Sequence, residues 1–215
     1  MFIFTVFFGK LAKISSDGLP YSLFVLIGLV FWGFFSNTLT HAASSLVENE
    51  SIIKKIYFPR LIMPISGILS PLVDFAVSIS ILVLMMAYYG FVPTINVVFL
   101  PLFILLALAT SLGIGLWLSA LNVKYRDFQY TVPFIIQIWM YASPVVYPAS
   151  MIPEAIRPLY GLNPMAGVIE GFRWALLGTE IPGPMILVSV GVVVVLLVSG
   201  MFYFRRMEQY YADIV

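Results

Sequence analysis

The sequence of 215 residues contains no cysteine and a single histidine, His41. Disulfides, thiolate metal sites and thiol nucleophiles are therefore excluded, and one histidine offers no cluster of metal ligands. The sequence also lacks the Gly-rich P-loop that holds the phosphates of ATP. Its net charge of +1 gives no electrostatic reason to expect nucleic acid as a partner. We predict no catalytic residue, no metal and no cofactor in this chain.

Charged residues are scarce as well, at 10% of the chain, whereas hydrophobic residues make up 61%. A soluble domain usually has about 25% charged residues, and its core cannot hide this much apolar surface. Lipid must therefore solvate part of the protein. The composition predicts an all-α integral membrane protein with a single domain over residues 1–215.

The spans follow from the length of the apolar segments, since crossing a bilayer takes about 20 apolar residues. Four segments meet this length: Leu19–Ala43, Leu61–Tyr89, Val97–Leu121 and Met185–Phe204. Thr131–Tyr147 is shorter, but its flanking aromatic residues are typical of membrane interfaces. Met1–Phe8 is too short to cross and lacks the features of a signal peptide. We expect it to be the end of another span, which gives about six spans with the first incomplete.

The orientation follows from the distribution of the eleven lysine and arginine residues over the connections. One side carries Lys54, Lys55, Arg60, Lys124, Arg126, Arg205 and Arg206. The other carries Lys10, Lys13, Arg157 and Arg173. The positive-inside rule places the richer side and the C-terminus in the cytoplasm. The segment Pro148–Pro184, called the outer segment below, then faces outward.

The first inside loop, Glu48–Phe58, has the pattern of an amphipathic helix that Pro59 ends. Its apolar face consists of Ile52, Ile53, Ile56 and Tyr57, and Glu50 and Lys54 can pair at i,i+4 on the other face. A helix this short needs a surface to pack against. Both a protein groove and the lipid headgroups fit this pattern.

The outer segment is too polar and too rich in proline to be another span, and it predicts two short helices. The first begins at Pro153-Glu154 and ends at Gly161; the second has Asn163 as its N-cap and Gly178 as its stop. In the second helix, Glu170 and Arg173 can pair at i,i+3 beside an apolar stripe of Ile169, Phe172 and Leu176. Both helices are too short to span, so they lie in the interface or enter the membrane and return.

Asp74 is the only charged residue inside a predicted span, and it lies on a stripe with Ser66, Ser70 and Ser78. An intramembrane carboxylate is a functional candidate, for instance in a proton relay. No other charged residue lies inside a span to complete a relay, and serine stripes usually serve helix packing. We predict a packing role, with a small face on the neighbouring helix as its counterpart: Ala107, Ser111, Gly115 and Ser119.

Four motifs along the chain resemble one transporter family: KKIYFPRLIMP (Lys54–Pro64), NVKYRDF (Asn122–Phe128), SPVVYP (Ser143–Pro148) and LNPMAGVIEGFRWALLG (Leu162–Gly178). They resemble the permease subunits of ABC-2 type exporters that move polysaccharide, such as O-antigen, capsule or teichoic acid. The resemblance implies half of a homodimeric channel in the cytoplasmic (inner) membrane, with a lipid-linked glycan as cargo. It also implies two copies of a separate cytoplasmic ABC ATPase, which would bind the ATP and magnesium. Relatives have more sequence before the first span, so we expect this chain to be truncated at its N-terminus.

The resemblance assigns roles to three groups of residues. The inside loop becomes a coupling helix for the ATPase through Glu48, Glu50, Ile52, Ile53, Lys54, Ile56 and Tyr57, with a second contact at Lys124, Arg126 and Asp127. The outer segment becomes a pair of re-entrant helices with a gate formed by Glu154, Arg157, Glu170, Phe172 and Arg173; a cap without gating is the alternative. The aromatic residues Phe31, Trp32, Phe35, Trp139, Tyr141 and Tyr147 line a conduit for sugar rings, unless they face lipid.

Three other functions fit parts of the sequence. An ABC-2 type exporter of drugs or small lipids has the same fold. A proton-coupled secondary transporter would use Asp74, but such transporters usually have internal repeats, and the sequence has none. A membrane enzyme could use only His41 with Ser44 or Ser45, and no acid lies near enough in sequence to orient that histidine.

Overall fold

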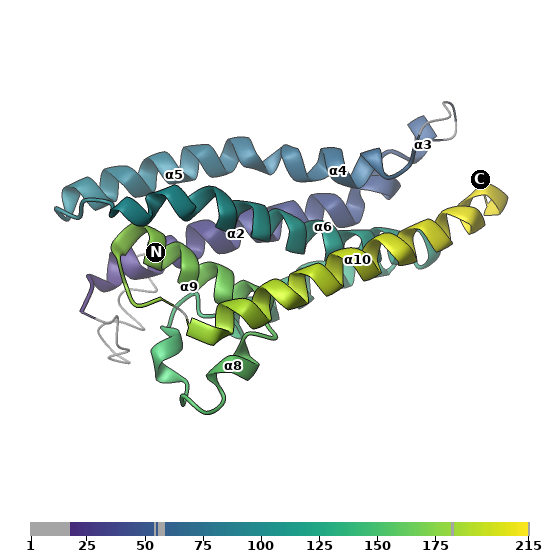
Figure 1. Ribbon diagram of the computed structural model, residues 1–215. Coiled ribbons are helices and arrows are strands. Elements are labelled where there is room, and N and C mark those ends of the chain that lie inside the picture. Colours follow the sequence, from purple (N-terminus) through teal and green to yellow (C-terminus); the bar gives the residue numbers. More distant parts are fainter. Residues whose placement is uncertain (1–17, 54, 56–58, 182, 215) are drawn as a thin grey trace.

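The computed structural model describes residues 18–214 except 54, 56–58 and 182, and it describes the side chains as far as Glu208. The described residues form helices and no strands. The long helices are α2 (Tyr21–Glu48), α4 (Ile62–Leu69) continued by α5 (Pro71–Tyr88), α6 (Leu100–Lys124), α7 (Phe128–Tyr141) and α10 (Gly183–Ile214). Shorter helices are α3 (Glu50–Ile53), η2 (Ile95–Phe99), η3 (Ala149–Met151), α8 (Arg157–Tyr160) and α9 (Pro164–Leu177). The loop around α3 and the C-terminus lie at one end, and α8 lies toward the other (Figure 1).

The four long predicted spans are confirmed by helices that are long and apolar enough to cross a membrane: Tyr21–Glu48, Ile62–Tyr88, Ile95–Lys124 and Gly183–Glu208. The first and last continue past their predicted ends at Ala43 and Phe204. In place of the fifth predicted span, α7 has 14 residues and ends at Tyr141, where the backbone turns before Pro144. A helix of that length rises only about 21 Å. The expected partial span, Met1–Phe8, lies outside the described residues.

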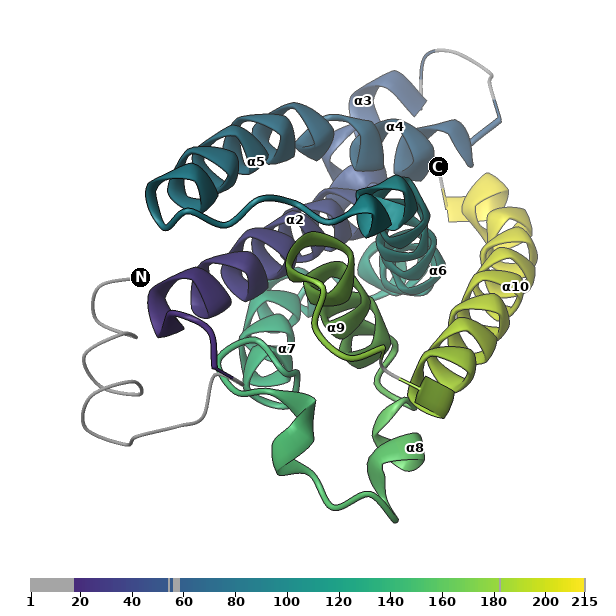
Figure 2. The same ribbon diagram turned by 60° about the vertical axis from the view of Figure 1, so that its left-hand side comes forward.

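Helix α2 lies at the centre of the bundle. It contacts α4, α5, α6, α7 and α9 (Figure 2). In its most apolar stretch of 18 residues, 61% of the residues are buried, against 22% in the corresponding stretches of the α4–α5 span and of α10. The outward faces of the peripheral helices carry exposed apolar residues such as Val77, Leu84 and Phe202. Such faces suit lipid or a protein partner.

Glycine allows the close helix crossings around α6. A Cβ on Gly115 would lie 2.5 Å from the Cβ of Ala42 in α2, and one on Gly200 in α10 would clash with the carbonyl oxygen of Gly113 in α6. The predicted small face of α6, Ala107, Ser111, Gly115 and Ser119, is indeed buried. It packs on α2, however, so the expectation that it matches the Asp74 stripe of α5 is corrected. Small residues let helix backbones approach, and α2 is the neighbour that comes closest.

Candidate functional site

Helix α9 holds the most heavily bonded charged residue in the described part of the chain, and its ends follow the predicted signals. The side chain of Asn163 accepts a hydrogen bond of 3.1 Å from the main-chain nitrogen of Met165, which satisfies the first turn. At the other end, Gly178 has a φ of 67°, the left-handed conformation that glycine adopts without a Cβ penalty. These two residues fix the start and end of the helix, and so the face on which Arg173 lies.

Arg173 is completely buried. Its guanidinium donates hydrogen bonds of 2.7 Å to the main-chain oxygens of Pro144 and Val145, and it lies 3.6 Å from the ring centroid of Phe24 in α2. It also forms an ion pair of 2.9 Å with Glu170. A buried charge is stable only when such partners replace the water it has lost. Arg173 therefore connects α9, the turn after α7 and α2.

Glu170 extends this network toward the surface. Besides the ion pair with Arg173, its carboxylate accepts a hydrogen bond of 3.1 Å from the main-chain nitrogen of Ala149. Arg157 of α8 donates from one terminal nitrogen to the main-chain oxygens of Ser150, at 3.4 Å, and Ile152, at 3.2 Å. The stretch between α7 and α9 has little regular secondary structure. Charged side chains therefore supply hydrogen bonds to its main chain.

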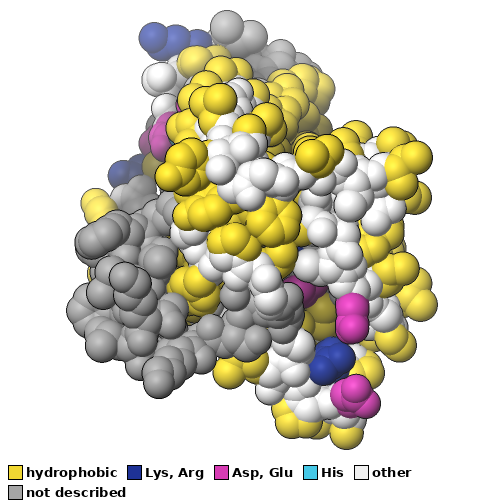
Figure 3. All heavy atoms as spheres, turned by 90° about the vertical axis from the view of Figure 1, so that its left-hand side faces the viewer, with side chains coloured by type: hydrophobic (Ala, Val, Ile, Leu, Met, Phe, Trp, Pro, Cys, Tyr) yellow, Lys and Arg dark blue, Asp and Glu magenta, His cyan; other side chains and the backbone are white. Residues whose placement is uncertain are grey.

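A cavity of about 660 Å³ lies between these groups. Four of the five predicted gate residues line it: Glu154, Arg157, Glu170 and Arg173. Figure 3 looks onto this end of the molecule: one group of acidic and basic side chains lies at the lower right, other charged side chains lie along the upper left edge, and the rest of the visible face is mostly uncharged. The fifth predicted gate residue, Phe172, does not line the cavity. It is buried in the core, with its ring centroid 3.9 Å from that of Phe31. The predicted i,i+3 pair of Glu170 and Arg173 is present.

The turn between α7 and the outer segment is held by side-chain hydrogen bonds that the sequence patterns did not predict. Trp139 donates to the side-chain oxygen of Asn163 at 3.0 Å, and the Asn163 amide donates to the carbonyl of Ala142 at 3.1 Å. The Tyr21 hydroxyl donates to the carbonyl of Val146 at 2.9 Å. An Asn-Pro pair signals an N-cap, but no local pattern shows that the same amide also reaches a turn 21 residues earlier.

Two tyrosines close the same region. Tyr160 donates to the carbonyl of Ala142 at 2.9 Å, and its oxygen lies 2.8 Å from that of Tyr147. Burial raises the pKa of Tyr160, and the hydrogen bond with Tyr147 raises it further, so the hydroxyl stays protonated as a donor. Tyr147, a predicted conduit residue, is half-buried, and its hydroxyl contacts that of Tyr160 and donates to the carbonyl of Tyr141.

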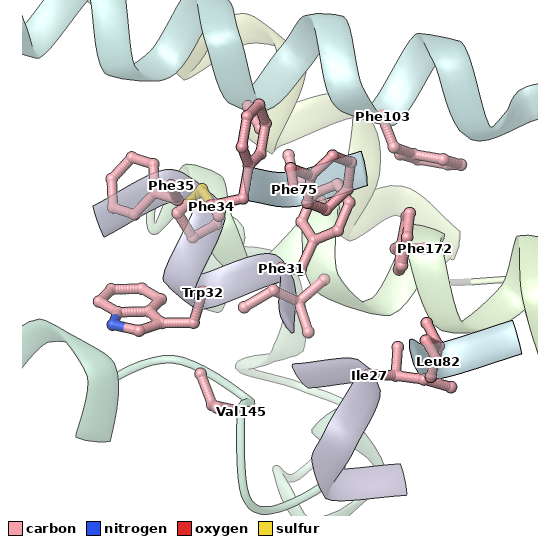
Figure 4. Packing of buried hydrophobic residues seen from close by; sticks show 14 of the residues in the cluster. Ile27, Phe31, Trp32, Phe34, Phe35, Phe75, Leu82, Phe103, Val145 and Phe172 are labelled. Atoms are coloured by element: carbon pink, nitrogen blue, oxygen red, sulfur yellow. The ribbon is translucent and has the colours of Figure 1, made fainter. Parts of the chain in front are cut away.

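The predicted conduit aromatics of α2 lie in the core of the chain. Phe31, Trp32 and Phe35 are buried, and Figure 4 shows Phe31 close to Phe75 of α5 and Phe172 of α9. Trp139 of α7 packs edge-on against Phe35 at a centroid distance of 5.2 Å. The structure thus corrects the prediction for these α2 residues: their rings are buried between the described helices. Tyr141 is exposed, as a conduit residue would need to be.

At the opposite end, the two predicted inside contacts lie next to each other. Glu50 of α3 forms an ion pair of 3.6 Å with Arg126 in the second inside loop. Glu48, Lys124 and Asp127 are exposed around them. Arg60 donates to the main-chain oxygen of Glu208 at 3.2 Å, which joins the first loop to the end of α10. Three separate stretches of sequence therefore form one surface.

The predicted coupling helix at Glu48–Phe58 is described only in part. Helix α2 reaches Glu48, and α3 covers four residues, Glu50–Ile53. Ile52 is 44% exposed, whereas Ile53 packs against the buried cluster of Leu46, Leu116, Ala120 and Phe204. The predicted single apolar face is thus divided between an outward and an inward residue. The remaining predicted coupling residues, Lys54, Ile56 and Tyr57, lie outside the described residues.

Comparison with known proteins places this arrangement in a family. The family model for ABC-2 type transporters matches residues 1–177. The chain belongs to the ABC-2 type transporter family. An O-antigen export system permease protein of Myxococcus xanthus is 30% identical over 97% of this chain and 81% of its own length. Two such permeases of Klebsiella pneumoniae are 28% and 26% identical, each over 91% of this chain and 76% of its own length.

With four membrane-length helices in its described part, this ABC-2 family member is a multi-pass protein of the cytoplasmic membrane. Its intramembrane carboxylate, Asp74, lies on the exposed face of α5 and borders a groove of about 220 Å³ with Asn37 of α2. Among the described residues the Asp74 side chain has no hydrogen-bond or ion-pair partner. The hydroxyl of Ser78 bonds to the main-chain oxygen of Asp74, and that of Ser66 to the main-chain oxygen of Met63, so neither reaches a neighbouring helix. Within the described part of the chain, the hydrogen bonds of these two serines therefore do not connect the stripe to another helix.

Proposed function

We propose that the protein is the transmembrane permease subunit of an ATP-driven exporter that moves a lipid-linked polysaccharide, such as O-antigen, capsule or teichoic acid, across the cytoplasmic membrane. The observation that carries this proposal is the similarity to O-antigen export permeases along almost the whole chain. Four spans and a hydrogen-bonded outer segment suit a transport subunit. Export of a drug or a small lipid by the same fold remains the alternative outcome of a transport assay.

The sequence contains no nucleotide-binding loop, and this supports an ATPase on a partner chain. We infer that two cytoplasmic ABC ATPases bind ATP and magnesium and dock at the inside surface built by Glu48, Glu50, Ile52, Lys124, Arg126 and Asp127. The exposed side chain of Ile52 beside charged residues is the pattern of an apolar anchor inside a polar rim. A second copy of the permease completes the channel in this proposal.

The docking proposal predicts a large effect for Ile52→Asp, because the new carboxylate would lose water on binding without a partner. We expect the affinity for the ATPase to fall at least tenfold, which corresponds to about 1.4 kcal/mol. The measurement is co-purification and titration of the cytoplasmic ABC ATPase proposed as the partner. Ser51→Asp adds the same charge to an exposed neighbour and serves as the control. Equal binding by wild type and Ile52→Asp would assign this surface to lipid headgroups instead.

Because the predicted conduit residues of α2 are buried, other residues must line the path of the cargo, and α7 offers an exposed aromatic face. Exposed on α7 are Tyr130 (69%), Phe134 (67%) and Tyr141 (54%), and their spacing puts them on one helical face together with the exposed Gln137. Rings stack on the apolar faces of sugars, and an amide can bond their hydroxyls. A face that met only lipid would gain nothing from Gln137. We propose that this face of α7 lines the path of the glycan.

Replacing Phe134 and Tyr141 with alanine should lower the export rate several-fold while assembly with the ATPase stays normal, because stacking contributes about 1 kcal/mol for each ring. Glycan on the cell surface is the readout. Tyr88→Ala removes an even more exposed ring from the end of α5 and is the matched control. If both variants export as wild type does, these α7 rings are interface anchors.

A further inference from the structure

The cavity in the outer segment lies beside the first residues of a span. Gly183, Pro184 and Met185 begin α10 and line it, together with Ile181 and the charged residues Glu154 and Glu180. The start of a span lies where hydrocarbon meets the headgroup layer. The cavity therefore presents charges and apolar side chains at the depth of lipid headgroups. Its size is within the range of ordinary ligand sites, roughly 300–1,000 Å³.

Among the residues that the structure describes, some that line this cavity carry hydrogen-bond donors without a partner, and others carry carboxylates without an ion pair. The Nε atom of Arg157 and the hydroxyl of Thr179 are buried and have no partner among the described residues. Glu154 and Glu180 are exposed and have no ion pair within the described part of the chain. Buried donors without partners usually mark a bound group or a water. Arginine and hydroxyl donors suit a phosphate, and carboxylates suit an ammonium.

Other ligand classes fit less well. A sugar site usually offers an aromatic platform, but the aromatic residue among the described lining residues, Phe24, is buried under the guanidinium of Arg173. A divalent cation needs several clustered oxygen ligands, and the described residues contain no group of three His, Cys, Asp or Glu that could hold one. A simple anion would be repelled by Glu154 and Glu180, whose charges have no ion pair among the described residues, whereas Glu170 is paired with Arg173.

We propose that this cavity binds the headgroup of a phospholipid that carries both a phosphate and a primary ammonium, as phosphatidylethanolamine does. The phosphate lies at Arg157 and Thr179, and the ammonium lies between Glu154 and Glu180. Because a primary ammonium donates three hydrogen bonds and a trimethylated one donates none, the site discriminates between ethanolamine and choline headgroups. This proposal is independent of which cargo the protein exports.

The experiment is native mass spectrometry of the 215-residue chain in detergent, with added phosphatidylethanolamine, phosphatidylcholine or phosphatidylglycerol of identical acyl chains. We expect phosphatidylethanolamine to bind about tenfold more tightly than phosphatidylcholine, the effect of one charge-assisted hydrogen bond. The double variant Glu154→Gln with Glu180→Gln keeps the side-chain shapes and should lose this selectivity. Glu48→Gln removes an exposed carboxylate from the opposite end and should keep it.

Several results would overturn the proposal. Equal binding of the ethanolamine and choline lipids would show that the ammonium is not recognised. Equal loss of selectivity in Glu48→Gln would show that the signal comes from lipid around the whole protein. Displacement of the lipid by a soluble oligosaccharide would assign the cavity to the glycan. Arg157→Gln provides an independent check on the phosphate, because it should weaken phosphatidylethanolamine and phosphatidylcholine by the same factor.

Discussion

Arg173 and Asp74 are both charged residues in apolar surroundings, but they differ in burial and in bonding partners. Arg173 is completely buried and has partners in three places: two carbonyls of the turn after α7, Glu170 and the ring of Phe24. Asp74 is exposed on α5, borders a small groove, and has no side-chain partner among the described residues. The charge of Arg173 is thus compensated by groups of the same chain, whereas the charge of Asp74 has no such compensation among the described residues.

The difference indicates which parts of the protein are complete by themselves. The outer segment can fold against α2 because its buried cation has its partners within the chain, namely two carbonyls, a carboxylate and a ring. The stripe on α5 cannot face hydrocarbon at low cost, because an intramembrane carboxylate needs protein or water. We therefore expect the face of α5 that carries Asp74 and the groove with Asn37 to be covered by protein or water in the assembled transporter.

The largest expected effect comes from removing the buried charge. Arg173→Met keeps the length of the side chain but leaves two carbonyl oxygens and Glu170 without their donor. Losing one partner of a buried charged network costs about 3–5 kcal/mol in the free energy of unfolding. Thermal denaturation in detergent measures this loss, with Arg206→Met on the exposed surface of α10 as the control. If both variants unfold at the same temperature, Arg173 does not hold the outer segment.

A smaller effect is expected from two glycines in α2. A Cβ on Gly28 would clash with the carbonyl oxygen of Val145 and lie 2.9 Å from a terminal nitrogen of Arg173. Gly28→Ala should therefore destabilise the protein by about 1–3 kcal/mol, the usual cost of overpacking. Gly33 is in the same helix and has nothing within 4 Å, so Gly33→Ala should be neutral or stabilise by up to about 1 kcal/mol. The same denaturation assay compares them, and equal effects would contradict the tight contact at Gly28.

Much of the fold could be predicted from the sequence because lipid imposes a simple length rule. The four long spans, the N-cap at Asn163 and the stop at Gly178 depend on local patterns, and the structure contains them. The end of α7 at Tyr141 was missed, since an apolar run does not show where a turn held by distant side chains begins. The bonds from Trp139 to Asn163 and from Tyr21 to Val146 connect residues far apart in sequence.

The functional residues were harder to predict because helical spacing gives a face but not its neighbour. Phe31, Trp32 and Phe35 have the composition of a conduit wall, and only the packing against α5, α7 and α9 shows that they are core. The Glu170–Arg173 pair was correct as a local i,i+3 contact. Its burial and its bonds to Pro144 and Val145 depend on tertiary contacts that no spacing encodes.

The smallest effect is expected at Asp74, and it sharpens the comparison with Arg173. Asp74→Asn keeps the shape and the hydrogen-bonding capacity of the side chain and removes only its charge. If a partner or water covers this face, the free energy of unfolding should change by less than about 0.5 kcal/mol, as for most exposed substitutions. Export should continue without a new dependence on pH. Asp74→Leu also removes the hydrogen-bonding oxygens, so a larger loss of assembly in this variant would place a protein partner on the stripe. Normal assembly of Asp74→Asn with complete loss of export would instead show that the carboxylate must ionise, as a proton-coupled mechanism requires.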